Sequence, residues 1–209
     1  MKLNERDVIV FQGDSVTDCG RDQLAEFSLG EGYCQLVYEY LKKERPQLNI
    51  TVLNRGVSGD RVKDLAARLE EDCLSLNPTV VSILIGINDT WRHYDSLDTT
   101  SVEAFEKTYR NILYQIKTQT QATLVLCQPF VLPVTAEQTH WHEDLNPKLD
   151  VIHRLVKEFD AIYVPFGTVL SKAAKEKGAA YFAIDGVHPT LAGHELMATT
   201  WLQTVEVIK

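Results

Sequence analysis

The chain is predicted to form one α/β domain in which a parallel sheet is covered by helices on both faces. Three observations support this prediction. Short apolar runs typical of buried strands alternate with segments whose apolar residues recur at helical spacing. The 209 residues suffice for one domain with a sizeable core that needs no disulfides. No repeat, low-complexity tract or linker divides the chain.

Five strands are expected along the sequence. The third is nearly all apolar, as expected for a strand in the centre of a parallel sheet. The expected strands cover residues 7–12, 50–53, 79–85, 122–127 and 161–164.

Six helices are expected between and after these strands. In residues 33–44 the apolar side chains recur every three or four positions, and Pro46 ends the pattern. Residues 128–146 contain two prolines and are expected to form a long surface loop, of a kind that often serves as a lid or a partner contact. The expected helices cover residues 33–44, 62–74, 102–117, 147–159, 169–177 and 191–205.

The charge balance argues against polyanionic partners. Lysine and arginine number 21 and aspartate and glutamate 29, which gives a net charge of −8. Without a basic stripe, nucleic acids and anionic membranes are not expected partners, and a small neutral substrate fits better. Residues 1–7 are charged and precede no apolar signal sequence, and no run of 18 apolar residues predicts a membrane span.

Cysteine and histidine usage predicts neither a metal nor a cofactor. The four cysteines are Cys19, Cys34, Cys73 and Cys127. Their spacing fits no zinc motif, and although their even number leaves disulfides open, free thiols in the cytoplasm are the expectation without an export signal. Cys19 is expected to be buried. His140 and His142 are two residues apart, but no further ligand completes a metal site.

Polar segments follow three of the expected strands and precede the last helix. Ligands of parallel α/β sheets bind at the carboxyl ends of the strands, so these segments are expected to converge on one edge. They cover residues 13–18, 54–60, 86–89 and 185–190.

A serine, a histidine and an aspartate in these segments suggest acyl transfer. Ser15 needs a base to become a nucleophile, and His188 can serve if Asp185, three residues earlier, holds its imidazole. The alternatives are a turn or N-cap role for Ser15 and Asp185 and a loop position for His188. His194 is a rival base, but it lies in the last helical pattern and is expected to pack or hydrogen-bond there.

Three groups could stabilise an oxyanion in such a site. They are the backbone N–H groups of Ser15 and Gly59 and the side-chain amide of Asn88. A donor of this kind typically contributes about 3–4 kcal/mol to lowering the barrier. Gly59 can also mark a tight turn, and Asn88 can cap the loop after the third strand.

The four segments together resemble the conserved blocks of the SGNH-hydrolase (GDSL-type) esterase superfamily. Gly-Asp-Ser, Gly-x-Ser-Gly-Asp, Gly-Ile-Asn-Asp and Asp-x-x-His-Pro occur here in that order. The resemblance implies a flavodoxin-like three-layer αβα sandwich with a five-stranded parallel sheet, formed as one domain by residues 1–209. It also implies a serine esterase with Ser15 as nucleophile, His188 as base and Asp185 as acid partner, and with Gly59 and Asn88 as oxyanion donors beside the Ser15 N–H.

A narrower resemblance concerns the substrate. Residues 13–21, 86–95 and 185–194 are similar to small intracellular acetyl esterases of this superfamily, which act on xylo-oligosaccharides and often form oligomers. The resemblance implies a cytoplasmic, homo-oligomeric enzyme that removes acetyl groups from sugars.

Three side chains near the expected site are candidates for substrate contacts. Trp91 could form a wall of the acyl or sugar pocket, or it could simply pack. Ile184 and Val187 could line a shallow apolar pocket.

Several other functions remain open at this stage. A lysophospholipase or an acyl thioesterase would use the same chemistry on longer acyl chains, and an acyltransferase would replace water by an alcohol. A carbohydrate-binding relative without catalysis is disfavoured, because a binding module does not need Ser15, Asp185 and His188 together.

Overall fold

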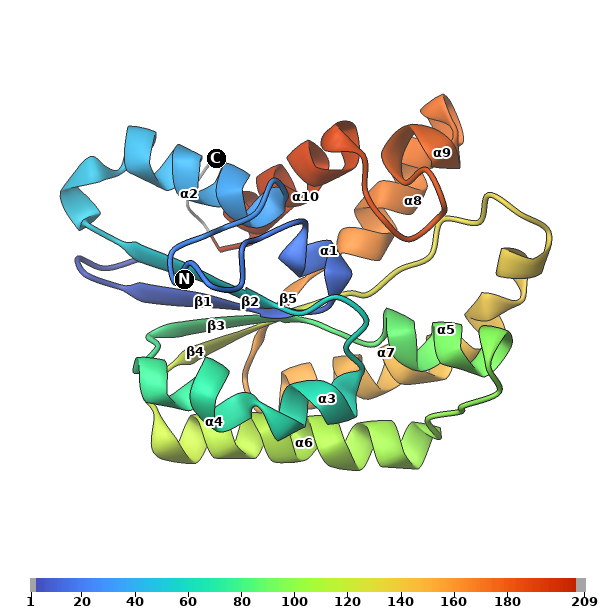
Figure 1. Ribbon diagram of the computed structural model, residues 1–209, viewed down its shortest axis with the longest axis horizontal. Helices are drawn as coiled ribbons and strands as arrows, with labels where there is room; N and C mark the ends of the chain where they lie inside the picture. Colours follow the sequence, from blue (N-terminus) through green and yellow to red (C-terminus); the bar gives the residue numbers. More distant parts are fainter. Residues whose placement is uncertain (1–2, 206–209) are drawn as a thin grey trace.

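All five strands of the central sheet run parallel, in the spatial order β2-β1-β3-β4-β5 (Figure 1). The computed structural model describes residues 3–205. The strands are β1 (Val8–Gly13), β2 (Thr51–Gly56), β3 (Val80–Leu84), β4 (Thr123–Cys127) and β5 (Ile162–Val164). The predicted five-stranded parallel sheet is confirmed.

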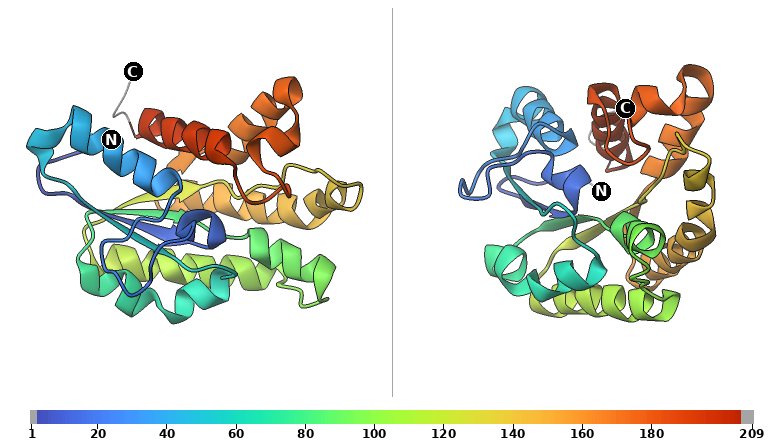
Figure 2. Two further views of the ribbon diagram at one scale, coloured as in Figure 1. Left: turned by 45° about the horizontal axis from the view of Figure 1, so that its top comes forward. Right: turned by 45° about the vertical axis from the view of Figure 1, so that its right-hand side comes forward.

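Helices cover both faces of this sheet, and Figure 2 shows the resulting three layers from two further directions. One layer contains α1 (Ser15–Asp18), α2 (Tyr33–Glu44), α8 (Phe166–Lys177), α9 (Ala179–Phe182) and α10 (Leu191–Thr204). The other contains α3 (Val62–Ala67), α4 (Leu69–Asp72), α5 (Ile87–Asp95), α6 (Val102–Gln119) and α7 (Trp141–Glu158). Short 3-10 turns are η1 (Pro46–Leu48), η2 (Leu74–Leu76) and η3 (Glu137–Thr139). None of the helices within residues 3–205 combines the length and the apolar character needed to cross a membrane.

The two faces of β3 contribute to two separate hydrophobic clusters. Val81 and Ile83 pack against α3, α4, α6 and α7, whereas Val80 and Leu84 belong to the cluster that includes α2, α8 and α10. All five residues of the strand are buried. Side chains of a strand alternate between its faces, so a strand covered on both faces reads as a continuous apolar run.

The carboxyl ends of three neighbouring strands lie level with one another. Gly13, the last residue of β1, pairs with Gly56 of β2 and with Leu84 of β3. The chain leaves β1 toward β2 on one side and returns to β3 on the other, so the strand order reverses at β1. Ligands bind at such a switch point in open α/β sheets.

Two predicted elements differ from the structure on the β2 side of the sheet. Residues 54–56, expected in a loop, extend β2 because they pair with β1. The helix expected over residues 62–74 is broken at Arg68, between α3 and α4. The side chain of Arg68 turns toward the ends of β1 and β2 at this break, where it donates to the carbonyls of Gly13 and Arg55.

Three further expectations were wrong in the part of the chain that follows β3. Residues 87–95 form helix α5, which was not expected although Ile87, Trp91 and Tyr94 recur at helical spacing. Helix α7 begins at Trp141, six residues before Pro147, which lies inside the helix. The segment 128–146 is not entirely a surface loop, because residues 130–132 are buried in the core.

An aromatic contact at β1 connects the sheet to the α2 and α10 layer. The ring of Phe11 lies 5.3 Å from that of Trp201 and 5.5 Å from that of Tyr33, and all three side chains are fully buried. The indole N–H of Trp201 donates to Ser82 Oγ at 3.0 Å, which satisfies two buried polar groups.

Phe11→Ala should lower the free energy of unfolding by about 3–5 kcal/mol, because it removes a buried ring and leaves a cavity. Urea denaturation measures this change. The matched control is Phe27→Ala, whose side chain is 66% exposed and whose loss should cost less than about 0.5 kcal/mol. Equal effects of the two substitutions would contradict the assignment of Phe11 to the core.

Candidate active site

Ser15 lies directly after β1, where the strand turns into the short helix α1. Asp14 is the N-cap of this helix, and its Oδ1 accepts a hydrogen bond from the backbone N–H of Val16 at 3.0 Å. A Cβ on Gly13 would approach Thr17 Oγ1 to 2.3 Å, so the turn needs glycine at this position. The local sequence therefore presents Ser15 at the carboxyl edge of the sheet.

Ser15, His188 and Asp185 form a continuous hydrogen-bonded chain. Ser15 Oγ lies 2.9 Å from His188 Nε2, and His188 Nδ1 lies 2.6 Å from Asp185 Oδ2. The other carboxylate oxygen of Asp185 accepts the backbone N–H groups of Val187 at 2.9 Å and His188 at 2.7 Å. The structure thus brings together three residues that the sequence separates by up to 173 positions.

The loop that carries Asp185 and His188 is held by the segment before α7. Leu132 N–H donates to the carbonyl of Gly186 at 2.7 Å, and the amide of Gln138 donates to the carbonyl of Asp185 at 2.6 Å. Gly186 has φ +85°, and a Cβ there would lie 2.7 Å from Gln138 Oε1. The sequence analysis missed Gln138, because no local motif connects it to a loop 47 residues away.

The electrostatics of Asp185 favour its charged form. Burial raises the pKa of this carboxyl, but hydrogen bonds from the His188 ring and from two backbone N–H groups lower it by more. The net pKa of Asp185 therefore lies below its ordinary value of 3.8. An ionised carboxylate only accepts hydrogen bonds, so the proton between the two groups belongs to His188 Nδ1. His188 Nε2 is then free to accept the Ser15 proton.

Two buried carboxyls that the sequence analysis assigned no chemistry lie close to this chain. Burial raises the pKa of Asp14 to about 7, which the hydrogen bond from Val16 and the nearby His188 offset only in part. Burial likewise raises the pKa of Asp89 to about 6, while its Oδ2 accepts the backbone N–H of Val62 at 3.0 Å. Both groups bind protons at a higher pH than exposed aspartates do.

The residues expected to donate to an oxyanion lie on two connected segments. Gly59 has φ +88°, a conformation that favours glycine, and no atom lies within 4 Å of where a Cβ would be. Asn88 is buried at the start of α5, and its side-chain amide donates to the carbonyl of Asp60 at 3.0 Å. An amide carries a second N–H, so this contact does not use up its donors.

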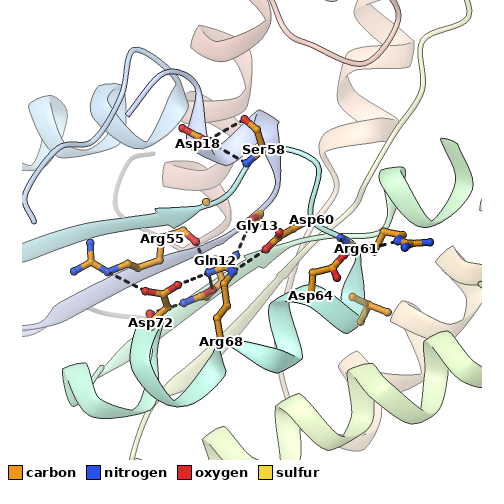
Figure 3. A network of polar contacts seen from close by, with 12 residues as sticks. Gln12, Gly13, Asp18, Arg55, Ser58, Asp60, Arg61, Asp64, Arg68 and Asp72 are labelled. Atoms are coloured by element: carbon orange, nitrogen blue, oxygen red, sulfur yellow. Dashed lines mark hydrogen bonds and ion pairs between the residues drawn. The ribbon is translucent and has the colours of Figure 1, made fainter. Parts of the chain in front are cut away.

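Ser58 connects the Gly59 segment to the helix that begins with Ser15. Its backbone N–H and its hydroxyl both donate to Asp18 Oδ2, at 3.1 and 2.9 Å (Figure 3). Asp18 is the last residue of α1. The segments after β1, β2 and β3 are therefore joined by hydrogen bonds that Ser58 donates to Asp18 and that Asn88 donates to the carbonyl of Asp60.

The three expected substrate-contact residues lie in different environments. The Trp91 ring is half-buried, 5.9 Å from the ring of His188 and 5.3 Å from that of Trp141. Ile184 is 74% exposed, whereas Val187 is 1% exposed and packs in the core. Ile184 is therefore exposed enough to contact a ligand, whereas Val187 is not.

His194 packs and hydrogen-bonds as expected. Its ring is 4% exposed, and its Nδ1 accepts the backbone N–H of Tyr33 at 3.1 Å. Because Nδ1 accepts a hydrogen bond, the proton of the neutral ring is on Nε2, which lies 3.3 Å from Cys19 Sγ. Cys19 itself is half-buried, not buried as expected, because it ends α1 in a left-handed conformation next to the exposed Gly20.

The two histidines around Trp141 lie at the start of α7. His140 is exposed, and its Nδ1 lies 3.0 Å from Glu143 Oε1. Within residues 3–205 no three histidine, cysteine, aspartate or glutamate side chains gather in a way that could hold a metal ion.

This strand-turn-helix serine with a histidine and an aspartate defines a hydrolase of the GDSL type. The chain matches the GDSL-like Lipase/Acylhydrolase family over residues 11–196 and belongs to that family, as the sequence predicted. An acetylxylan esterase from Geobacillus stearothermophilus is 33% identical over 213 residues, which cover 98% of this chain and 96% of the relative. The chain is accordingly a hydrolase of carboxylic esters.

Solved structures agree with this assignment over nearly the whole chain. A protein from Parabacteroides merdae, described as a GDSL-like lipase, superposes with a TM-score of 0.93 at 36% identity and 99% coverage of both chains. The Geobacillus stearothermophilus acetylxylan esterase Axe2 superposes with a TM-score of 0.91 at 33% identity, covering 98% of this chain and 96% of its own. Structures of Axe2 include catalytic mutants in which a serine, an aspartate and a histidine are each replaced by alanine.

His194→Gln should change how the stability of the protein depends on pH. Burial lowers the pKa of His194 from 6.5 to about 4, so the unfolded chain binds more protons than the folded protein between these values. The stability due to the neutral ring is complete above pH 6.5 and is lost as the pH falls toward 4. The difference in unfolding free energy between wild type and variant should therefore shrink by up to about 3 kcal/mol from pH 7 to pH 4.

Urea denaturation at several pH values measures this difference. The matched control is His153→Gln, because the His153 side chain is exposed on α7. A pH-independent difference for His194→Gln, or the same narrowing for His153→Gln, would contradict burial of His194 as the cause.

Proposed function

We propose that this protein is a serine esterase that forms an acyl-enzyme on Ser15. The observation that carries the proposal is the hydrogen-bonded chain from Ser15 Oγ through the His188 ring to Asp185, with contacts of 2.9 and 2.6 Å. A serine hydroxyl is unreactive at neutral pH, and an adjacent base held by a third group is the arrangement that activates it.

In the first half of the reaction, Ser15 Oγ attacks the ester carbonyl carbon while His188 Nε2 takes its proton. The electron pair of the carbonyl double bond moves to oxygen and gives a tetrahedral oxyanion. Ionised Asp185 stabilises the imidazolium without taking its proton. The intermediate then collapses, the bond to the alcohol breaks, and His188 delivers the proton to the leaving oxygen.

In the second half, water replaces the alcohol. His188 removes a proton from the water as its oxygen bonds to the acyl carbon. The second tetrahedral intermediate expels Ser15 Oγ, which takes its proton back from His188, and the carboxylic acid leaves. Both intermediates carry an oxyanion, for which we propose the N–H groups of Ser15 and Gly59 and the Asn88 amide as donors.

The Axe2 mutants support these residue roles. The aspartate and the histidine replaced in the catalytic mutants of that enzyme are three positions apart, as are Asp185 and His188. The replaced serine has the same residue number as Ser15.

We further propose that the substrate is a short acyl ester, an acetyl group on a sugar such as a xylo-oligosaccharide. The 33% identical acetylxylan esterase supports this substrate. The half-buried ring of Trp91 beside His188 also supports it, because an aromatic face can lie against a pyranose ring at the alcohol side of the ester.

A cytoplasmic location is part of the proposal. All four cysteines are free thiols in the structure, as is usual for proteins of a reducing compartment. Assembly into a homo-oligomer stays a prediction of the sequence.

Ser15→Ala should reduce kcat for p-nitrophenyl acetate by roughly 10⁴-fold or more, because the covalent step is lost. It should also abolish labelling by a serine-directed fluorophosphonate. Ser75→Ala, which changes an exposed serine on η2, is the matched control and should leave both readouts intact. Undiminished hydrolysis by Ser15→Ala would refute the acyl-enzyme mechanism.

Acetate release from acetylated xylo-oligosaccharides should exceed hydrolysis of p-nitrophenyl octanoate in kcat/KM. With p-nitrophenyl acetate, butyrate and octanoate, activity should fall as the acyl chain lengthens. A silent sugar assay with fast octanoate turnover would instead indicate lipid or thioester substrates. Formation of acetylated alcohol in place of acetate would indicate an acyltransferase.

A further inference from the structure

Arg68, between α3 and α4, makes a dense set of polar contacts beneath the carboxyl edge of the sheet (Figure 3). Its side chain is 16% exposed. Five acceptors lie 2.7–3.0 Å from its guanidinium nitrogens, and three of them share the two N–H groups of Nη1. The acceptors are Gln12 Oε1, Asp60 Oδ2, Asp72 Oδ2 and the carbonyls of Gly13 and Arg55.

Two of these bonds hold the ends of adjacent strands. Nη2 donates to the carbonyl of Gly13 at 3.0 Å, and Nη1 donates to the carbonyl of Arg55 at 2.7 Å. Gly13 lies two residues before Ser15, and Arg55 lies four residues before Gly59. Arg68 therefore links the carboxyl ends of β1 and β2, from which the segments with Ser15 and Gly59 begin.

A third bond reaches the loop that carries Gly59. Arg68 Nε donates to Asp60 Oδ2 at 2.7 Å, in an ion pair whose two side chains are 16% and 11% exposed. The backbone carbonyl of the same Asp60 accepts the Asn88 amide at 3.0 Å. One residue thus connects the guanidinium to Gly59 through the chain and to Asn88 through a hydrogen bond.

Gly59 has no side chain of its own to fix it. Its left-handed backbone is flanked by open space, so its position depends on the residues on either side. Ser58 is bound twice to Asp18 of α1, and Asp60 is bound to Arg68. Gly59 therefore lies between two anchored residues, Ser58 and Asp60, whose contacts are drawn in Figure 3.

The guanidinium is itself fixed by its partners. Asp72 Oδ2 and Gln12 Oε1 each accept from Nη1 at 3.0 Å, and the Gln12 amide donates to the carbonyl of Asp72 at 2.6 Å. A planar guanidinium presents five N–H donors in a fixed fork, whereas a lysine ammonium presents three donors at one point. A lysine at position 68 would keep the charge but could not reach all these acceptors.

We propose that Arg68 is a positioning residue for the oxyanion hole. Through Asp60 it holds the Gly59 N–H and the Asn88 amide in place, and through Gly13 it aligns them with Ser15. Oxyanion donors act only within hydrogen-bond distance of the transition-state oxygen, so a small displacement of this loop weakens catalysis more than substrate binding. This inference rests on the proposed function, because it assumes that Ser15 is the nucleophile.

The test compares Arg68→Lys and Arg68→Gln with wild type on p-nitrophenyl acetate. Rates are normalised to the serine titrated by a fluorophosphonate, so that only folded enzyme is counted. The matched control is Arg110→Gln on α6, which removes an arginine paired with Glu106 and Glu158 on the surface away from the site. Binding of phenylboronic acid, which forms a tetrahedral adduct with a nucleophilic serine, reports the oxyanion hole directly.

Both Arg68 variants should lower kcat per titrated serine roughly ten- to a hundredfold, with KM changed less than about threefold. Affinity for phenylboronic acid should fall in parallel with kcat. Arg110→Gln should leave kcat, KM and boronic acid affinity at wild-type values. In an Asn88→Ala background, Arg68→Lys should have a smaller effect than in wild type, because both substitutions act on the same donor.

A wild-type kcat per titrated serine in the Arg68 variants would overturn the inference, even if less folded enzyme is recovered. If neither variant folds, Asp60→Ala carries the test, because it keeps the backbone carbonyl that accepts from Asn88 and removes the side chain that accepts from Arg68. A normal kcat in that variant would likewise overturn the inference. Ser15→Ala separates the two proposals: full activity of that variant refutes the proposed function, whereas Ser15-dependent activity unaffected by Arg68 refutes this inference alone.

Discussion

The level ends of β1, β2 and β3 are the constraint on which the rest of the site depends. Gly13, Gly56 and Leu84 stand side by side in the parallel ladder, so three loops start from one line at the edge of the sheet. A one-residue slip of a strand would turn its side chains to the opposite face, and both faces are packed by helices, which makes this register the stable one. The positions of Ser15 and of the Gly59 and Asn88 loops follow from it.

The strand register sets where the loops of the site begin, and hydrogen bonds between the loops then hold them in place. The loop with Asp185 and His188 precedes α10. It is held by Leu132 and Gln138, which lie in the segment between β4 and α7. The other loops are joined by carboxylates, which accept from backbone groups, serine and arginine. Several of these carboxylates are buried, so their bonds form in a medium of low dielectric, where each contact is stronger than in water.

The sequence predicted an element accurately where neighbouring residues determine it, and failed where contacts with distant segments determine it. The helix over residues 33–44 was predicted to the residue, because its apolar period and the following Pro46 are local signals. The break at Arg68 was missed because its cause is a set of contacts with β1 and β2. The early start of α7 at Trp141 and the burial of residues 130–132 were missed for the same reason.

The sequence by itself determined the α/β class, the number of strands, the family and the identity of the candidate nucleophile, base and acid. These follow from periodicity and from short motifs, and both act over a few residues. Only the tertiary structure decided that Ser15 and His188 lie 2.9 Å apart, that Val187 is in the core, and that Arg68 and Gln138 hold the loops of the site. Such contacts join residues from 8 to 173 positions apart. They are selected by packing and by the satisfaction of buried hydrogen-bonding groups, which are properties of the whole fold.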